Sequence, residues 1–207
     1  MPAFVIVAGP NGSGKTTLVR SGVLASVLGV PDVSLNADDV ARELAGGGQP
    51  TEQQSLRAAR ITDNRLDVEI AAGRSVIVET VLSSDKYQDR VGAARAMGYR
   101  IDLIYVTVRE AELNVARVDQ RVTLGGHAVP AERIRERRAR SHILFRWFAN
   151  AADRVFVFDN SLAQPRLAAM KGPEGWTILD LGALPADLGR TLTELYQPPQ
   201  PLTHAGD

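Results

Sequence analysis

Short apolar runs of strand length alternate along this chain with longer stretches of helical pattern. The strand-like runs cover residues 3–8, 33–36, 75–80, 100–108 and 154–158. Helical patterns between them cover residues 15–28, 40–44, 51–72, 85–97, 110–122 and 131–150. This alternation predicts an α/β fold, a three-layer sandwich built around a mostly parallel five-stranded sheet. In such a sheet, ligands bind beyond the carboxyl ends of the strands.

The carboxyl-terminal part of the chain continues this pattern more weakly. Residues 176–179 are a candidate for an extra strand at the sheet edge, and residues 185–196 have the pattern of a last helix. Residues 197–207 are rich in proline, and this composition predicts a disordered tail. We therefore expect residues 1–196 to form a single domain.

Residues 9–16 carry the most informative motif. They read Gly-Pro-Asn-Gly-Ser-Gly-Lys-Thr between the first strand and the first helix, which is the context of a Walker A phosphate loop. Its glycines allow positive φ angles and bring backbone N–H groups close to phosphate oxygens. We predict that Lys15 reaches the β- and γ-phosphates and that Thr16 presents its hydroxyl to Mg²⁺. The full set predicted to bind the nucleoside triphosphate is Gly9, Pro10, Asn11, Gly12, Ser13, Gly14, Lys15, Thr16 and Thr17.

Composition narrows the class of protein. Lys+Arg and Asp+Glu both number 24, and a net charge of zero argues against an obligatory nucleic-acid partner. The absence of cysteine excludes disulfides, thiolate metal sites and thiol nucleophiles. No segment approaches the roughly 18 apolar residues of a membrane span. The first residues lack a basic region of the signal-peptide kind, so we expect a cytoplasmic protein with no membrane partner.

Acidic residues follow two of the predicted strands. Asp38 and Asp39 come after the second strand, and Glu79 and Thr80 close the third. A kinase needs a carboxylate that orients the acceptor hydroxyl and takes its proton, and Asp38 is the candidate for this base. In the alternative interpretation, Asp38 or Asp39 caps the helix over residues 40–44. Glu79 is a candidate contact to the metal or the substrate, or else a structural acceptor for nearby backbone, and Thr80 is a candidate substrate contact.

Arginines gather after the fourth strand. Arg117 and Arg121 share a helix face, and the next helix carries Arg133, Arg135, Arg137, Arg138, Arg140 and Arg146. Two such helices joined by Gly125-Gly126 predict a lid over about residues 109–146. Its guanidinium groups would stabilise a transferring phosphoryl group, and Arg121 and Arg137 are the candidates. Ordinary solvated helix faces, paired with Glu132 and Glu136, are the alternative.

Two further polar sites have open interpretations. His127 either contacts substrate or phosphate, or only stabilises the turn between the lid helices. Asn160, within Asp159-Asn160-Ser161, either lines the adenine pocket or belongs to the cap of a helix that begins near Leu162.

Together these motifs resemble the zeta-toxin family of P-loop kinases over about residues 3–161. The most specific part is Gly-Gly-His-Ala-Val-Pro at residues 125–130, followed by an arginine-bearing helix and the later Asp-Asn-Ser. The resemblance implies ATP-dependent transfer to a sugar hydroxyl of UDP-N-acetylglucosamine, and an antitoxin partner. It also implies that Asp38 is the catalytic base, that Lys15, Arg121 and Arg137 act on the phosphates, and that Glu79 lies at the substrate.

The chain departs from that family after the third strand. The characterised toxins carry a Glu-Gly-Thr-Leu-Arg-like run there, whereas Glu79 is followed here by Thr80-Val81-Leu82-Ser83. Two alternatives therefore stay open. One is a kinase for another small-molecule hydroxyl acceptor, such as an antibiotic or a nucleoside. The other is a nucleotide-dependent regulatory ATPase that signals through lid closure.

Overall fold

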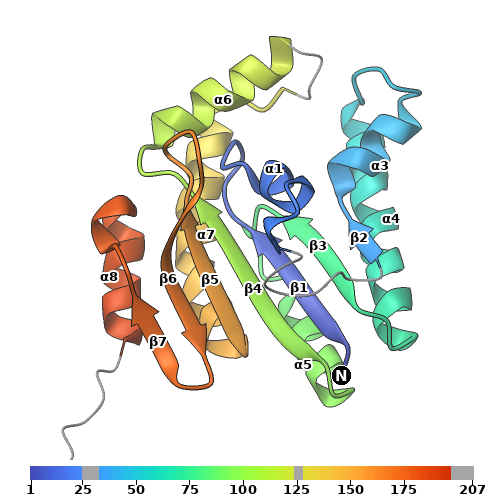
Figure 1. The fold of residues 1–207 in the computed structure, drawn as a ribbon. Coiled ribbons are helices and arrows are strands. Elements are labelled where there is room, and N and C mark those ends of the chain that lie inside the picture. The colour runs from blue at the N-terminus through green and yellow to red at the C-terminus, as the bar shows by residue number, and fades with distance from the viewer. Residues whose placement is uncertain (25–32, 124–127, 197–207) are drawn as a thin grey trace, which may run out of the picture.

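The computed structural model describes residues 1–24, 33–123 and 128–196, and a single sheet runs through it (Figure 1). Its seven strands lie in the order β2-β3-β1-β4-β5-β6-β7. The strand pairs from β2 to β5 are all parallel, which confirms the predicted α/β sheet. These strands are β1 (Ala3–Ala8), β2 (Val33–Leu35), β3 (Val76–Thr80), β4 (Arg100–Thr107) and β5 (Arg154–Asp159).

Two antiparallel strands extend the sheet beyond β5, so the predicted count of five strands was wrong. β6 (Arg166–Gly172) pairs with β5, and β7 (Gly175–Ile178) pairs with β6. β7 corresponds to the candidate edge strand, but β6 was not predicted. The middle of β6 reads Ala-Ala-Met-Lys, and these residues favour helices. Pairing with β5 and β7 overrides that preference.

Helices cover the sheet on both faces (Figure 1). Alternate residues of β1 point to opposite faces, so Phe4 and Ile6 pack in one core cluster while Val5 and Val7 pack in another. The second cluster includes Leu18 of α1. The described helices are α1 (Lys15–Arg20), α3 (Ala37–Leu44), α4 (Glu52–Ala71), α5 (Gln88–Ala96), α6 (Ala111–Thr123), α7 (Ala131–Ala151) and α8 (Ala186–Leu195), with a 3₁₀ turn at Leu181–Ala183.

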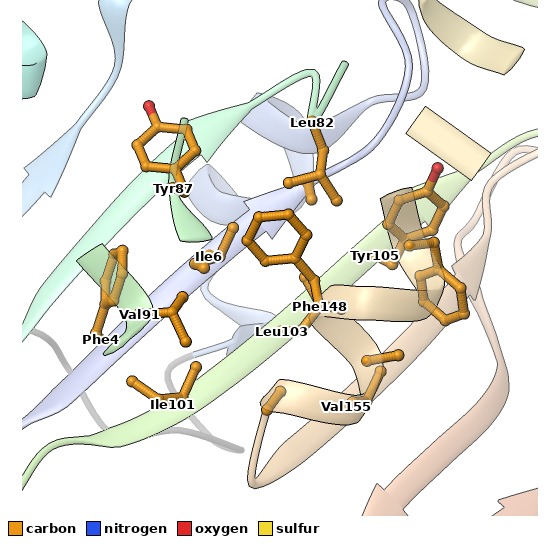
Figure 2. Close-up of a cluster of buried hydrophobic side chains, with 14 of the residues drawn as sticks. Phe4, Ile6, Leu82, Tyr87, Val91, Ile101, Leu103, Tyr105, Phe148 and Val155 are labelled. Carbon is orange, nitrogen blue, oxygen red and sulfur yellow. The ribbon is translucent and has the colours of Figure 1, made fainter. Parts of the chain in front are cut away.

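The larger core cluster joins the sheet to α4, α5, α7 and α8. Figure 2 shows part of it, with Val91 of α5 and Phe148 of α7 beside the central strands. The rings of Tyr105 and Phe145 lie 4.8 Å apart between their centroids, and both side chains are fully buried. Such packing holds α7 against β4, and α7 is one of the two predicted lid helices. The part of the predicted lid that α7 forms is therefore anchored in the hydrophobic core.

Two predicted helix starts were wrong, namely residue 40 for the short helix after β2 and Leu162 for a helix after β5; the first of these helices, α3, begins at Ala37. Asn36 caps α3, because its side-chain oxygen accepts a hydrogen bond from the backbone N–H of Asp38 at 2.9 Å. No helix begins near Leu162; the segment after β5 is irregular up to β6, and Asp159 Oδ1 accepts from the Ser161 N–H at 3.0 Å.

Three predictions concern residues outside the described ranges. These are the end of the first helix at residues 25–28, the glycine turn at residues 124–127 with His127, and the tail at residues 197–207. Among the helices that the structure describes, none is long and apolar enough to cross a membrane.

Candidate active site at the carboxyl ends of the strands

The loop after β1 has a backbone that favours glycine at three positions. The φ angle is +141° at Gly9, +72° at Gly12 and +94° at Gly14. A Cβ atom on Gly9 would lie 2.0 Å from the carbonyl oxygen of Val106, and one on Gly12 would lie 2.5 Å from that of Asn114. The loop is therefore packed tightly between the end of β4 and α6, as a cradle of backbone N–H groups requires.

Lys15, the first residue of α1, folds back over this loop. Its Nζ donates to the carbonyl oxygens of Gly9 at 2.8 Å and Pro10 at 3.0 Å. Burial lowers the pKa of Lys15 to about 8, while the carboxylates of Glu79 and Asp38 act in the opposite direction. The ammonium therefore remains largely protonated at neutral pH, close to both acidic residues.

The Thr16 hydroxyl lies between the ends of β2 and β3. It donates to Glu79 Oε2 at 2.6 Å and accepts from Asn36 Nδ2 at 3.4 Å. The parallel register that pairs Val7 with Glu79 brings the carboxylate to the loop. A hydroxyl and a carboxylate at this distance are the hard oxygen ligands that suit Mg²⁺.

Asp38 lies in the first turn of α3 with its side chain 64% exposed. Its Oδ2 is 3.6 Å from a guanidinium nitrogen of Arg121, which comes from α6. Because Asn36 caps the helix, the carboxylates of Asp38 and Asp39 do not perform that task. Asp39 pairs instead with Arg20 of α1 at 3.2 Å, so the two neighbouring aspartates have different surroundings.

Of the two predicted lid helices, α6 lies beyond the same ends of the strands, and α7 runs along one face of the sheet with its start beside α6 (Figure 1). Arg121 reaches Asp38 from α6. On α7, burial and the neighbouring Arg133 and Arg140 lower the pKa of Arg137, and the Asp38 carboxylate acts against them. The structure thus brings both predicted lid arginines close to the predicted base.

Arg138, the next residue on α7, is buried and serves another purpose. It donates to Asn114 Oδ1 at 2.6 Å, and to the carbonyl oxygens of Val108 and Arg109 at 2.8 Å each. Asn114 Nδ2 in turn donates to the carbonyl oxygen of Asn11 at 2.7 Å. A chain of hydrogen bonds therefore runs from the lid helices to the phosphate loop.

Asn160 also contacts the loop. Its Nδ2 donates to the Ser13 carbonyl oxygen at 2.8 Å, and a Cβ atom on Gly14 would lie 2.2 Å from that nitrogen. Its backbone N–H donates to the Thr107 carbonyl oxygen at 2.8 Å, and its own carbonyl oxygen accepts from Arg117 at 2.8 Å. Asn160 is thus held beside the phosphate loop.

Sequence reasoning missed Asn114 and did not separate Arg138 from the other lid arginines. Both positions lie on the buried stripes of their helices. Asn114 is one turn from the buried Val118, and Arg138 lies four residues from the buried Ile134. A polar residue on an apolar helix stripe is a signal that could have identified each of them.

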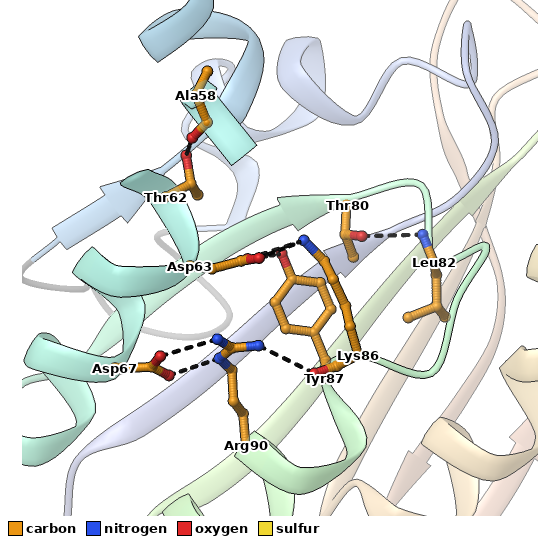
Figure 3. A network of polar contacts seen from close by, with 9 residues as sticks. All are labelled: Ala58, Thr62, Asp63, Asp67, Thr80, Leu82, Lys86, Tyr87 and Arg90. Atoms are coloured by element: carbon orange, nitrogen blue, oxygen red, sulfur yellow. Dashed lines mark hydrogen bonds and ion pairs between the residues drawn. The ribbon is translucent and has the colours of Figure 1, made fainter. Parts of the chain in front are cut away.

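The segment after β3 forms a strained turn next to Glu79. Leu82 is buried with a φ angle of +58°, which is rare for a residue with a side chain. Its N–H donates to Thr80 Oγ1 at 3.1 Å, and Lys86 donates to Asp63 of α4 at 2.9 Å close by (Figure 3). The Thr80 hydroxyl therefore takes part in fixing this turn.

The predicted site residues separate into three groups. One group gathers at the carboxyl ends of the strands, and it comprises the loop residues 9–14 with Lys15, Thr16, Asp38, Glu79, Thr80, Arg121, Arg137 and Asn160. Thr17 follows on α1 with an exposed side chain. His127 lies outside the described residues.

A hollow of about 680 Å³ lies at α3 and the glycines after it. It is lined by Asp39, Arg42, Glu43, Gly46 and Gly47, and so by none of the residues in the three groups above.

Comparison with known proteins gives one family match. The family model described as AAA domain matches residues 4–143 of this chain. An uncharacterized protein of Haemophilus influenzae is 26% identical over 133 residues, which are 64% of this chain and 90% of that protein.

Solved structures share the fold. The AvrRxo1-ORF1:-ORF2 complex with ATP matches with a TM-score of 0.69 and 16% identity, over 100% of this chain and 66% of that chain. The PezAT chromosomal toxin-antitoxin system of Streptococcus pneumoniae matches with a TM-score of 0.60 and 14% identity, over 95% of this chain and 78% of that chain. At these identities, the likenesses show a shared fold.

Proposed function

The chain belongs to the AAA domain family, and we propose that it is an ATP-dependent phosphotransferase that moves the γ-phosphate to the hydroxyl of a small molecule. The single observation that carries the proposal is the position of Asp38. Its exposed carboxylate lies 3.6 Å from Arg121 of the lid and close enough to Lys15 to influence the pKa of that ammonium. A base between the loop lysine and a lid arginine is what transfer to a hydroxyl needs.

The loop suits a phosphate chain. Besides its backbone, it carries two buried polar atoms, Asn11 Oδ1 and Ser13 Oγ, that have no hydrogen-bond partner within the described residues. A serine hydroxyl can donate to a phosphate oxygen, so the loop retains hydrogen-bonding capacity for an anion. Lys15 adds the positive charge that the β- and γ-phosphates require.

The proposed reaction balances as follows. The acceptor oxygen forms a bond to the γ-phosphorus, and the bond from that phosphorus to the β,γ-bridging oxygen breaks, which releases ADP. The acceptor proton passes to the carboxylate of Asp38. Arg121 and Arg137, which lie close to Asp38, stabilise the charge on the transferring phosphoryl oxygens.

The Thr16 hydroxyl and the Glu79 carboxylate would hold Mg²⁺. Thr16 Oγ1 and Glu79 Oε2 lie 2.6 Å apart, and both are oxygen ligands. When bound, the ion would neutralise charge on the β- and γ-phosphates. Thr17 is proposed to support the phosphates next to Thr16, and Asn160 is proposed to line the nucleotide site.

The acceptor is proposed to be a nucleotide sugar such as UDP-N-acetylglucosamine, with contacts from Glu79, Thr80 and His127. The zeta-toxin resemblance supports this choice, as does the shared fold of a toxin-antitoxin structure. Growth arrest on expression in bacteria, and a protein partner of the antitoxin kind, are proposed on the same basis.

The test is incubation with ATP, Mg²⁺ and a panel of hydroxyl acceptors that includes UDP-N-acetylglucosamine, antibiotics and nucleosides. Mass spectrometry should find one acceptor heavier by one phosphoryl group. Asp38→Asn should lower the rate by at least about a hundredfold, since it removes the base. Asp39→Asn is the matched control and should leave the rate within about threefold, because Asp39 pairs with Arg20 on the neighbouring helix.

A regulatory ATPase would give a different result. It would hydrolyse ATP slowly, no acceptor would gain mass, and acceptors would not change the hydrolysis rate. An undiminished rate of transfer in Asp38→Asn would instead remove Asp38 from the proposed mechanism.

A further inference from the structure

Two carbonyl oxygens of the phosphate loop are held from outside by side-chain amides. Asn114 Nδ2 of α6 donates to the Asn11 carbonyl oxygen at 2.7 Å. Asn160 Nδ2, which follows β5, donates to the Ser13 carbonyl oxygen at 2.8 Å. The two amides come from segments far apart in the sequence and converge on alternate peptide groups of the loop.

Holding these carbonyl groups fixes the direction of the next N–H groups. In a trans peptide the C=O and the following N–H lie in one plane and point in opposite directions. The described part of the chain contains no cis peptide bond. The hydrogen bond to Asn11 therefore aims the N–H of Gly12 away from Asn114, and the hydrogen bond to Ser13 aims the N–H of Gly14 away from Asn160. Such N–H groups form an anion-binding concavity.

Each amide is itself held by a second contact. Asn114 Oδ1 accepts from the buried Arg138 at 2.6 Å, so the orientation of its NH₂ group is fixed. Asn160 is anchored through its backbone, where the N–H donates to Thr107 and the carbonyl oxygen accepts from Arg117, both at 2.8 Å. The amides therefore act as fixed donors and not as mobile side chains.

The cost of burying Arg138 supports a role beyond folding. All of its hydrogen-bond acceptors within the described residues are neutral, namely Asn114 Oδ1 and the carbonyl oxygens of Val108 and Arg109. Burial lowers the pKa of Arg138, and the carboxylates of Asp187 and Glu110 act in the opposite direction without forming an ion pair with it among the described residues. A buried charge without a carboxylate partner destabilises a fold relative to an apolar side chain of similar size. Stability alone does not account for an arginine at this position.

A neighbouring arginine offers the natural comparison. Arg135, also on α7, forms a bidentate ion pair with Glu112 of α6, and both N···O distances are 2.9 Å. This pair joins the same two helices at the surface, but it does not contact the loop. The link through Arg138 and Asn114, by contrast, continues to the phosphate site.

We infer that Asn114 and Asn160 are positioning residues, which hold the Gly12 and Gly14 N–H groups toward the phosphates, and that Arg138 holds Asn114 in place. The inference rests on the proposed nucleotide site. It adds that hydrogen bonds from α6 and α7 hold the loop backbone from outside. The positioning residues do not touch the reacting atoms; they act through the loop backbone.

The experiment measures the dissociation constant of Mg·ADP by calorimetry, together with the thermal unfolding midpoint of the nucleotide-free chain. Asn114→Leu has nearly the shape of asparagine but lacks the donor, and it should weaken Mg·ADP binding about tenfold. Arg135→Met is the control, and it should leave the dissociation constant within about twofold even if it lowers the unfolding midpoint. A purely structural role for Asn114 would lower the midpoint and leave the affinity of the folded chain unchanged.

Asn160→Ala provides an independent test, because it removes the second donor without leaving a buried guanidinium group unpaired. It should also weaken Mg·ADP binding about tenfold, and it decides the matter if Asn114→Leu does not fold. Unchanged affinity in the folded variants, or an equal loss in Arg135→Met, would overturn the inference. Because ADP binding needs no acceptor, failure of phosphoryl transfer with normal ADP binding would contradict only the proposed function.

Discussion

The two sides of the proposed site are built differently. On the nucleotide side, the loop carbonyl oxygens accept hydrogen bonds from Lys15, Asn114 and Asn160, and neighbouring backbone or side-chain atoms leave no room for side chains on the loop glycines. On the acceptor side, Asp38 and Arg121 are 64% and 43% exposed, and the closest contact between them is 3.6 Å. One side is already fixed by the protein, while the other consists of charges that face solvent.

This difference indicates which part of the site is ordered before its ligand binds and which part the ligand must order. A phosphate chain is the same in every nucleoside triphosphate, so a rigid cradle can be prepared for it. Acceptors differ in shape, and the charges around Asp38 lie on separate elements, α3, α6 and α7. We expect the acceptor side to be ordered by lid closure on its ligands.

The largest effect is expected from a change on the acceptor side. Arg121→Met should lower the rate of phosphoryl transfer by about a hundredfold or more, because a lid arginine acts on the transition state. It should leave the dissociation constant of Mg·ADP within about threefold. Rates measured at saturating ATP, beside calorimetry with ADP, separate the two quantities.

Arg146→Met is the control for Arg121→Met. Arg146 is an exposed arginine on α7 that pairs with Glu194 of α8. The Arg146→Met substitution should change neither the rate of phosphoryl transfer nor the dissociation constant of Mg·ADP. If Arg121→Met weakened ADP binding as strongly as it slowed transfer, the separation between the two sides would be lost.

A smaller effect is expected on the nucleotide side when pH rises. The pKa of Lys15 is lowered to about 8, so its charge is lost above that pH unless a bound phosphate retains it. Binding of Mg·ADP should weaken by up to about tenfold per pH unit above 8. The stability of the nucleotide-free chain should change in the opposite direction, because the unfolded chain binds more protons between pH 8 and 10.5.

Lys15→Met tests the assignment of this pH dependence. Its ADP binding should be weak and nearly independent of pH between about 7 and 9. Lys86→Met, in which an ion pair with Asp63 is lost, should retain the natural pH profile. A profile that persisted in Lys15→Met would assign the titration to another group.

The smallest effect is expected far from both sides. The pKa of Asp187 on α8 is lowered to about 2, chiefly by its hydrogen bond from the buried His142 of α7 at 2.7 Å. Because Asp187 is half exposed, Asp187→Asn should reduce the free energy of unfolding by only about 1 kcal/mol at neutral pH. That difference should be present above about pH 4 and disappear as pH falls toward 2. Denaturant unfolding at several pH values measures it, and unchanged ADP affinity would keep this pair outside the site.

The sequence predicted the parts of the molecule that local chemistry determines. The phosphate loop follows from glycine, lysine and threonine at fixed spacing, and the parallel core follows from continuous apolar runs. Thr51 and Gln54 form the capping box of α4 at the start of the predicted helix over residues 51–72. In each case the residues that produce the structure are neighbours in the sequence.

Features that depend on distant residues were missed. β6 is a strand because it pairs with β5, although its own residues favour a helix. One local feature was also predicted wrongly: Asn36 caps α3 in preference to the acidic residues after it, since the helix begins earlier than the apolar pattern indicated. The contacts of Asn114 and Arg138 join residues 103 and 24 positions apart, so only the fold brings them together.

We propose that a hydroxyl acceptor, bound beside Asp38, receives the phosphoryl group of ATP. The most direct measurement follows ADP and phosphorylated acceptor in the same reaction for the natural chain and Asp38→Asn. The two products should appear in equal amounts for the natural chain, and both should almost vanish in Asp38→Asn. Slow ADP formation that no acceptor in the panel accelerates, at the same rate in both proteins, would contradict this proposal.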